Sequence, residues 1–361
     1  MEQAGYVPEH HVPLQDRHAR DEALIERQQR LLIKNRELTG LLENLEIGYR
    51  RDIRALVGEE SYDANVDRQR DLQKRFAQLC DSFPVTPEGE RARQEQRRRL
   101  LQEKHDLYHG LGIDIDRGVA IRKAHLNGVK TTAAGHIDLD LEMTPRPEGE
   151  PPAPTNNPWT WYTAPYAHQW ASIQFSAGSA GSIWRSANAW ASTGEVNLAS
   201  WIELFGAGDS DWSKADAMCE VGFWFRMPAA GILEVWAWFQ DINTDYSVYL
   251  EDESGCSDAY VHQLSRLYLW TAGSTERYLT VLDKKRGEED EGSWSDSLTK
   301  PGAIQAKLFH SQKTYAAGEW VYGAVGVRDF NLFQVDDMSC RSRMYSQYFL
   351  KQLAVRSTGA P

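Results

Sequence analysis

The sequence predicts a multidomain α+β protein, in which an N-terminal α-helical bundle or coiled coil precedes a C-terminal antiparallel β-sandwich of jelly-roll type. Two observations lead to this fold class. All 13 tryptophans of the 361 residues lie between Trp159 and Trp320, whereas the chain before Pro158 is charged and carries leucines at helical spacing. After Pro158 short alternating stretches are separated by glycine, serine and aspartate, which is typical of antiparallel sheets.

The N-terminal part is expected to be an extended arm over 1–15 and helical over 16–112. A seven-residue spacing predicts an apolar seam on the first helix, with Leu24, Leu31, Asn35, Leu38, Leu42 and Leu45 as its members. The polar Asn35 lowers stability but can fix register. Two interpretations remain open, because the helices can close into a bundle, including a third helix starting near Thr86, or the seam can join copies into a homo-oligomer.

A connector over 113–144 separates the helical part from a proline-rich linker. Alternation from Ile137 to Met143 predicts a strand over 136–143, and the turn residues Asn127-Gly128 suggest a neighbouring strand over 119–126. Residues 145–158 carry six prolines and predict a semi-rigid linker. The tryptophan-rich domain is therefore expected over 159–361.

Strands are expected in the C-terminal part wherever apolar and polar residues alternate over several positions. The clearest are 218–227, 232–241, 260–271, 277–283, 319–328 and 344–356. The first two each have one unbroken apolar face, predicted to point into the core and made of Cys219, Val221, Phe223, Phe225, Leu233, Val235, Ala237 and Phe239.

The opposite faces of 218–227 and 232–241 give the candidate binding site. A hairpin through 229–231 would place four pairs of residues opposite each other, namely Trp224 with Trp236, Arg226 with Glu234, Glu220 with Gln240 and Gly222 with Trp238. Indoles stack on sugar rings, and carboxylates and amides bind hydroxyls, so this face suits a glycan. The alternative is that the helical part, the linker or residues 159–162 cover the face and make it ordinary core.

Two further interpretations concern catalysis and metal binding. Glu220 and Glu234 could act as the acid and base of a glycan-cleaving hydrolase, which requires two carboxylates on either side of one bond. Asp241, Asn243 and Asp245 have the spacing of the first calcium ligands, but a turn between strands is the simpler interpretation, and no cofactor is expected otherwise. Cys256 and Cys340 could pair only in an oxidising medium.

Composition limits the partners. The net charge is −12 and the basic residues are interspersed with acids, so nucleic acid is not expected as a partner. We expect a soluble protein of cytoplasmic synthesis, without a signal peptide or a transmembrane segment, and with a possible role in a larger assembly.

These observations favour a non-enzymatic structural or binding protein. The helical part would anchor or oligomerise it, and the lectin-like head would bind a glycan, a cell surface or a protein surface. The hydrolase is one alternative. A toxin-like protein whose helical part rearranges at a membrane is another, although its helices are too charged to span a bilayer as they stand.

Overall fold

The computed structural model of the chain is mostly antiparallel β-sheet, with a long helix at the N-terminus. Isolated residues between 61 and 112 are described as well. The continuous stretches that the structure describes are 7–59, 114–137, 159–162, 166–178, 182–191, 197–208, 211–252, 258–288, 292–297, 304–336 and 338–358.

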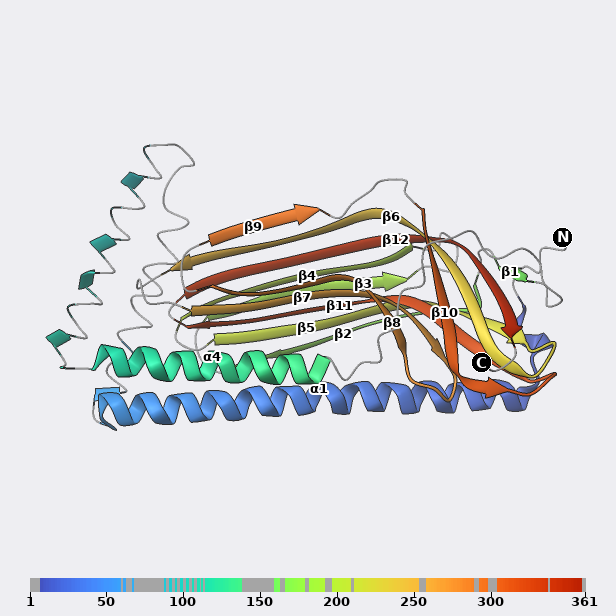
Figure 1. Ribbon diagram of the computed structural model, residues 1–361, viewed down its shortest axis with the longest axis horizontal. Helices are drawn as coiled ribbons and strands as arrows, with labels where there is room; N and C mark the ends of the chain where they lie inside the picture. Colours follow the sequence, from blue (N-terminus) through green and yellow to red (C-terminus); the bar gives the residue numbers. More distant parts are fainter. Residues whose placement is uncertain are drawn as a thin grey trace.

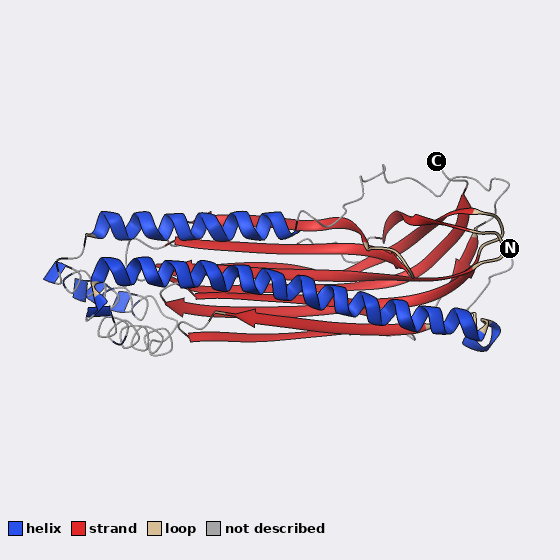
Figure 2. Ribbon diagram, turned by 90° about the horizontal axis from the view of Figure 1, so that it is seen from below, coloured by secondary structure: helices blue, strands red, loops and turns tan. Residues whose placement is uncertain are grey.

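Among the elements that the structure describes in full, three helical ones precede the strands. A short 3₁₀ turn η1 (Glu9–His11) precedes α1 (Leu14–Val57), and α4 (Ile115–Ile137) follows later in the chain. Helix α1 begins after Pro13, which has no backbone N–H to leave unpaired at a helix start, and ends at Gly58, whose φ of 91° suits glycine. Helices α1 and α4 run side by side along one side of the sheets (Figures 1 and 2).

The strands form two antiparallel sheets. Sheet A has the order β2-β5-β11-β7-β8, and sheet B has the order β10-β6-β12-β4-β3, with β1 on β12 and β9 on β6. The strands are β1 (Thr160–Tyr162), β2 (His168–Ala177), β3 (Ser182–Ala191), β4 (Asn197–Gly208), β5 (Asp211–Arg226), β6 (Gly231–Asp252), β7 (Asp258–Thr271), β8 (Arg277–Glu288), β9 (Gly292–Ser297), β10 (Ile304–Tyr315), β11 (Trp320–Asp336) and β12 (Met338–Thr358). All six predicted strands overlap these almost completely.

The two sheets share a hydrophobic core. The eight residues predicted to face inward from 218–227 and 232–241 are all buried in one cluster, which confirms that prediction. β5 contributes four of them from sheet A, and β6 contributes the other four from sheet B. Because strand side chains alternate, the residues between them point away from this shared core.

Helix α1 covers the outward face of sheet A with the predicted seam. Leu31 packs with Trp224, Tyr268 and Trp270, and Leu38 and Leu42 pack with residues of α4 and sheet A. Leu38 and Leu42 are each 1% exposed. The seam is therefore occupied within the chain, and the structure does not confirm a coiled coil.

The expected strand over 119–126 is wrong, because these residues and the Asn127-Gly128 pair lie inside α4. The residues of α4 that pack with α1 and sheet A are Leu126, Val129 and Ala133, at spacings of three and four, so a helical period was present and the turn signal misled.

Other predicted features lie outside the described residues. These are residues 138–143 of the predicted strand, the linker over 145–158, and most of the third helix. The division into domains stays a prediction. Within the described helices, none combines the length and hydrophobicity that crossing a membrane requires.

Candidate functional site

The predicted hairpin between 218–227 and 232–241 is wrong, because the two strands belong to different sheets. β5 pairs with β2 and β11, whereas β6 pairs with β10, β12 and β9. Trp224 therefore does not face Trp236, and the other three predicted pairs fail with it. A hairpin and a crossover between sheets both place the same alternate residues in the core, so the pattern could not distinguish them.

The β5 half of the predicted site is closed by α1. Glu220 is 0% exposed and Trp224 is 2% exposed, and Arg226 alone remains exposed at the end of the strand. The space above Gly222 is filled by Tyr322, whose hydroxyl group would clash with an added Cβ. For this half, the interpretation as covered core holds.

Arg27 of α1 neutralises the buried Glu220. Its Nη1 donates to both carboxylate oxygens of Glu220 at 2.8 Å, and its Nε donates to Glu276 Oε1 at 2.6 Å. The hydroxyl of Tyr268 donates to Glu220 Oε2 at 2.7 Å. The guanidinium lies 4.6 Å from the ring centroid of Trp270, which adds a cation–π contact. These contacts bind the helix to the sheet.

The outward face of sheet B differs, because no described helix packs against it (Figures 1 and 2). Arg341, Arg343 and Lys351 of β12 are exposed there, and Tyr345 and Phe349 are partly exposed. In the described part of the chain, the helices therefore cover sheet A over much of its length and leave this face of sheet B without a helical layer.

A row of stacked indoles lies on this open face. Trp238 of β6 stacks on Trp161 of β1 at 5.4 Å and on Trp236 at 6.0 Å between ring centroids, with interplanar angles of 29° and 28°. Ala354 of β12 is the register partner of both Trp161 and Trp236, and its small side chain leaves room between them. Trp161 and Trp238 are partly exposed, and Trp236 is 5% exposed.

Polar side chains lie beside the indoles. Gln352 is the register partner of Trp238, and Gln240 lies two residues beyond Trp238; both amides are partly exposed. A β-bulge between Leu350 and Gln352 leaves Lys351 exposed, with its Nζ 4.9 Å from the ring centroid of Phe349. Aromatic faces and hydrogen-bonding groups therefore lie together.

An ion pair supports the inner end of the row. The Nε of Arg356 donates to Glu234, and its guanidinium lies 4.2 Å from the ring centroid of Trp159. His310 of β10 approaches Glu234 from the other side, with 3.7 Å between Nδ1 and Oε1. Arg356, rather than the predicted Arg226, is thus the partner of Glu234.

Glu220 and Glu234 cannot form a pair of catalytic carboxylates. Glu220 points outward from sheet A beneath α1, and Glu234 points outward from sheet B, so the shared core lies between them. Glycoside hydrolysis needs both carboxyl groups within about 5–9.5 Å across one bond. This arrangement contradicts the proposed roles of these two residues.

The predicted calcium loop is an uninterrupted part of β6. Asp241, Asn243 and Asp245 are paired in register with β12, so the backbone does not curl around an ion. In the part of the chain that the structure describes, no group of three or more His, Cys, Asp or Glu residues could hold a metal. Cys340 is a buried free thiol, and Cys256 lies outside the described residues.

The sequence did not predict the site residues Trp159, Trp161, Lys351, Gln352 and Arg356. The alternation of Trp159, Thr160 and Trp161 was a usable signal, since it places both indoles on one face of a strand. Arg356 had no signal of its own, because its pairing with Glu234 depends on a register between distant strands.

Comparison with protein-family models finds no match, and neither does comparison with curated protein sequences. Among solved structures, the chain is similar to TmCBM61 in complex with β-1,4-galactotriose, at 12% identity and a TM-score of 0.14, over 38% of this chain and 69% of that one. A second is the C-terminal family 22 carbohydrate-binding module of Clostridium thermocellum Xyn10B, at 13% identity and a TM-score of 0.13, over 45% and 92%.

A third is tailspike protein 4 of bacteriophage CBA120, at 8% identity and a TM-score of 0.12, where the match spans 53% of this chain and only 18% of the tailspike. Superpositions with such low scores carry no argument about fold or function. The functional argument therefore rests on the residues of this chain.

Proposed function

We propose that this chain binds a glycan on the outward face of sheet B, as a non-enzymatic binding protein. The observation that carries the proposal is the stacked row of Trp161, Trp238 and Trp236 on a face that no described helix covers. We further propose that the two sheets form a sandwich in which α1 docks on the outward face of sheet A.

The chemistry of the row suits a sugar ring. The C–H face of a pyranose is apolar and packs on an indole, while its hydroxyls need donors and acceptors at the rim. Trp161 and Trp238 offer partly exposed rings, and Gln240, Gln352 and Lys351 offer amide and ammonium groups beside them. Trp236 lies deeper and fixes the orientation of Trp238 by stacking.

The row is also held rigidly before any ligand arrives. Trp161 and Trp236 lie on strands that both pair with β12, and the Arg356–Glu234 ion pair joins β12 to β6 two register positions from the Ala354–Trp236 pair. A preformed site loses less side-chain entropy on binding, which favours affinity. Binding without cleavage is proposed because Glu220 lies on the other sheet.

The test is binding of the full chain to a panel of neutral and acidic oligosaccharides, comparing Trp161→Ala and Trp238→Ala with the unmodified protein. Each change is expected to weaken binding by at least tenfold, since removal of a stacked aromatic anchor typically costs about 2 kcal/mol or more. Trp190→Ala is the matched control, because Trp190 is a partly exposed indole of β3 on the same sheet outside the row.

The proposal would be contradicted if all three variants lost glycan affinity equally. It would also be contradicted if Trp161→Ala and Trp238→Ala both bound the glycan as the unmodified protein does. If no glycan binds, and a protein ligand binds the unmodified chain but neither Trp161→Ala nor Trp238→Ala, the face is a protein-binding surface instead.

A further inference from the structure

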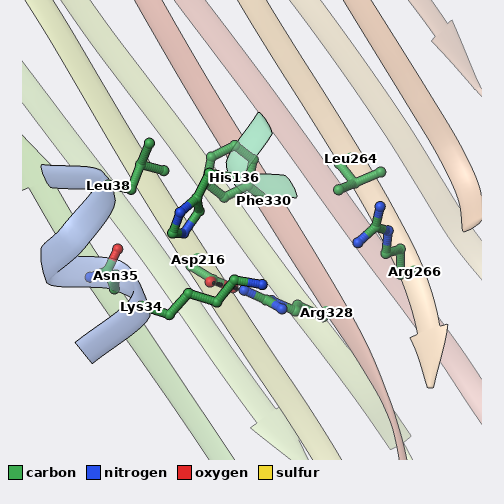
Figure 3. A pocket seen from close by; sticks show the side chains of 9 residues that line it. All are labelled: Lys34, Asn35, Leu38, His136, Asp216, Leu264, Arg266, Arg328 and Phe330. Atoms are coloured by element: carbon green, nitrogen blue, oxygen red, sulfur yellow. Dashed lines mark hydrogen bonds and ion pairs between the residues drawn. The ribbon is translucent and has the colours of Figure 1, made fainter. Parts of the chain in front are cut away.

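A small cavity lies between the two helices and sheet A, away from the indole row (Figure 3). Its volume is about 20 Å³. The residues that line it are Lys34, Asn35, Leu38, His136, Asp216, Leu264, Arg266, Arg328 and Phe330. Helix α1 supplies the first three, α4 supplies His136 from its last turn, and β5, β7 and β11 supply the others.

Positive charge converges on this cavity. Arg266 and Arg328 are direct register partners on β7 and β11, although like charges in such positions destabilise a sheet. Arg266 is 4% exposed and the side chain of Arg328 is 12% exposed, so water screens them little. Lys34 approaches the same space from α1, as Figure 3 shows.

Asp216 is the one carboxylate among the lining residues, and Arg328 pairs with both of its oxygens, while Lys214 and Lys34 also stabilise its charge. The two guanidinium nitrogens of Arg328 donate to Asp216 Oδ1 at 2.9 Å and to Oδ2 at 2.6 Å. With three cationic side chains and one carboxylate, the lining carries a formal excess of positive charge in a chain whose net charge is −12.

A buried lysine beside the cavity experiences the same environment. Lys214 is 1% exposed, and its ammonium donates to the backbone oxygen of Asn35 at 3.1 Å. Burial lowers the pKa of Lys214 to about 8; Asp216 opposes this shift, and Arg328 adds to it. Loss of hydration on burial is therefore the main cause of this shift, and the argument for an anion rests on the charges that line the cavity.

We propose that this cavity binds a halide-sized inorganic anion, with chloride as the natural occupant. The volume decides the size class, because a water-sized species needs about 10–15 Å³ of such space and a tetrahedral oxyanion needs more. Lys34 and Arg266 would supply N–H donors from α1 and β7, so that the bound ion would connect the helix to the sheet.

The consequence is linkage between chloride and the docking of α1. A ligand that binds only the folded state raises its stability by RT ln(1 + [L]/Kd). Chloride should therefore raise the melting temperature of the full chain saturably at constant ionic strength, and bromide should replace it. Gluconate is too large for the cavity and serves as the inert anion.

The experiment titrates chloride, bromide and sulfate against gluconate at fixed ionic strength, on the unmodified chain and on Lys34→Gln and Arg266→Gln. Both variants are expected to weaken the apparent affinity for chloride at least tenfold. Arg51→Gln is the control, because Arg51 lies on the same helix with its side chain 77% exposed and pairs with the adjacent Asp52. Bromide in crystals of the full chain should give an anomalous peak at the cavity.

Two results would overturn the proposal. One is a melting temperature that does not distinguish chloride from gluconate, together with no bromide peak. The other is a response that sulfate shares equally or that Lys34→Gln leaves unchanged. Should Arg266→Gln fail to fold, Lys34→Gln and the bromide peak decide the matter, since Lys34 is only partly buried.

Discussion

Arg27 and Glu220 form an ion pair between α1 and β5 in which neither side chain reaches solvent, with 2% and 0% of their surfaces exposed and 2.8 Å between nitrogen and oxygen. Around them lie Glu276, Tyr268 and Trp270. The helix therefore contributes a charge that the sheet requires, in addition to apolar contacts.

The first prediction concerns this charge. Replacement of Arg27 by methionine should lower the free energy of unfolding by about 3–5 kcal/mol, because Glu220 would remain buried without its counter-ion. Denaturant unfolding followed by tryptophan fluorescence measures the change. Arg51→Met on the same helix should have little effect, since its ion pair is exposed.

The double variant Arg27→Met with Glu220→Gln tests the cause. Removing both charges should recover part of the loss, because the penalty comes from the unpaired carboxylate. A double variant that is as unstable as the sum of the two single variants would show that packing, and not charge, is responsible.

The sequence could predict which residues of β5 and β6 face the core, but not which strands lie beside them. The alternation of β5 and β6 was sufficient to assign their inward faces, because burial of one face follows directly from a period of two. The partner strands could not be predicted. They depend on contacts between residues about a hundred positions apart, as in the pairing of Glu220 with Gly326.

The leucine seam shows the same limit. Its spacing of seven correctly marks the apolar side of α1, but spacing does not say whether a helix or a sheet lies opposite. The polar seam residue Asn35 contacts Lys214 of β5, and Arg27, which the seam did not include, contacts Glu220 of the same strand. A helical seam alone would not require these contacts.

The candidate site was predicted in part. Trp236, Trp238 and Gln240 do lie together on an open face, because they alternate on one strand. Trp224 and Glu220 were joined to them only by the assumed hairpin, and this assumption failed.

The second prediction distinguishes the two roles that the leucine seam could have. Leu38→Asp should destabilise the folded chain by more than the roughly 2–5 kcal/mol of a large-to-small core change, because it also buries a carboxylate beside apolar residues of α4 and sheet A. Thermal melting and light scattering are measured together. Ile47→Asp is the control, since Ile47 lies on α1 with 65% of its surface exposed.

An oligomer that becomes a folded monomer of unchanged melting temperature in Leu38→Asp would contradict the intramolecular role. If the unmodified chain associates and Ile47→Asp does not, the interface lies instead on the outer side of α1.

The third prediction concerns two aspartates, one buried and one partly buried, with opposite dependence on pH. Asp329 is 0% exposed between the sheets, and burial raises its pKa although Ser200, Ser265 and Ser346 donate hydrogen bonds to it. For Asp216, burial acts in the same direction, but the Arg328 guanidinium outweighs it and lowers the pKa. The two groups therefore differ in which state of the chain binds the proton more tightly.

The sign follows from proton linkage. With a raised pKa, folded Asp329 keeps its proton above the pH at which the unfolded chain, with an ordinary pKa of about 3.9, has lost it. Stability therefore falls as pH rises through that window. Asp216 behaves in the opposite way, because its stabilising charge is present above the unfolded pKa and is lost as pH falls through the lowered folded pKa.

Asp329→Asn should therefore increase the free energy of unfolding at pH 7 relative to the unmodified chain and remove the fall in stability above about pH 4, by roughly 1.4 kcal/mol for each unit by which the pKa is raised. Asp216→Asn should decrease stability at pH 7, because it leaves Arg328 without its carboxylate, and the difference from the unmodified chain should narrow as pH falls toward 3. Urea unfolding between pH 3 and pH 8 measures both. If Asp329→Asn is less stable than the unmodified chain at every pH, then the hydrogen bonds from the three serines to a charged carboxylate outweigh its burial, and Asp329 is ionised in the core.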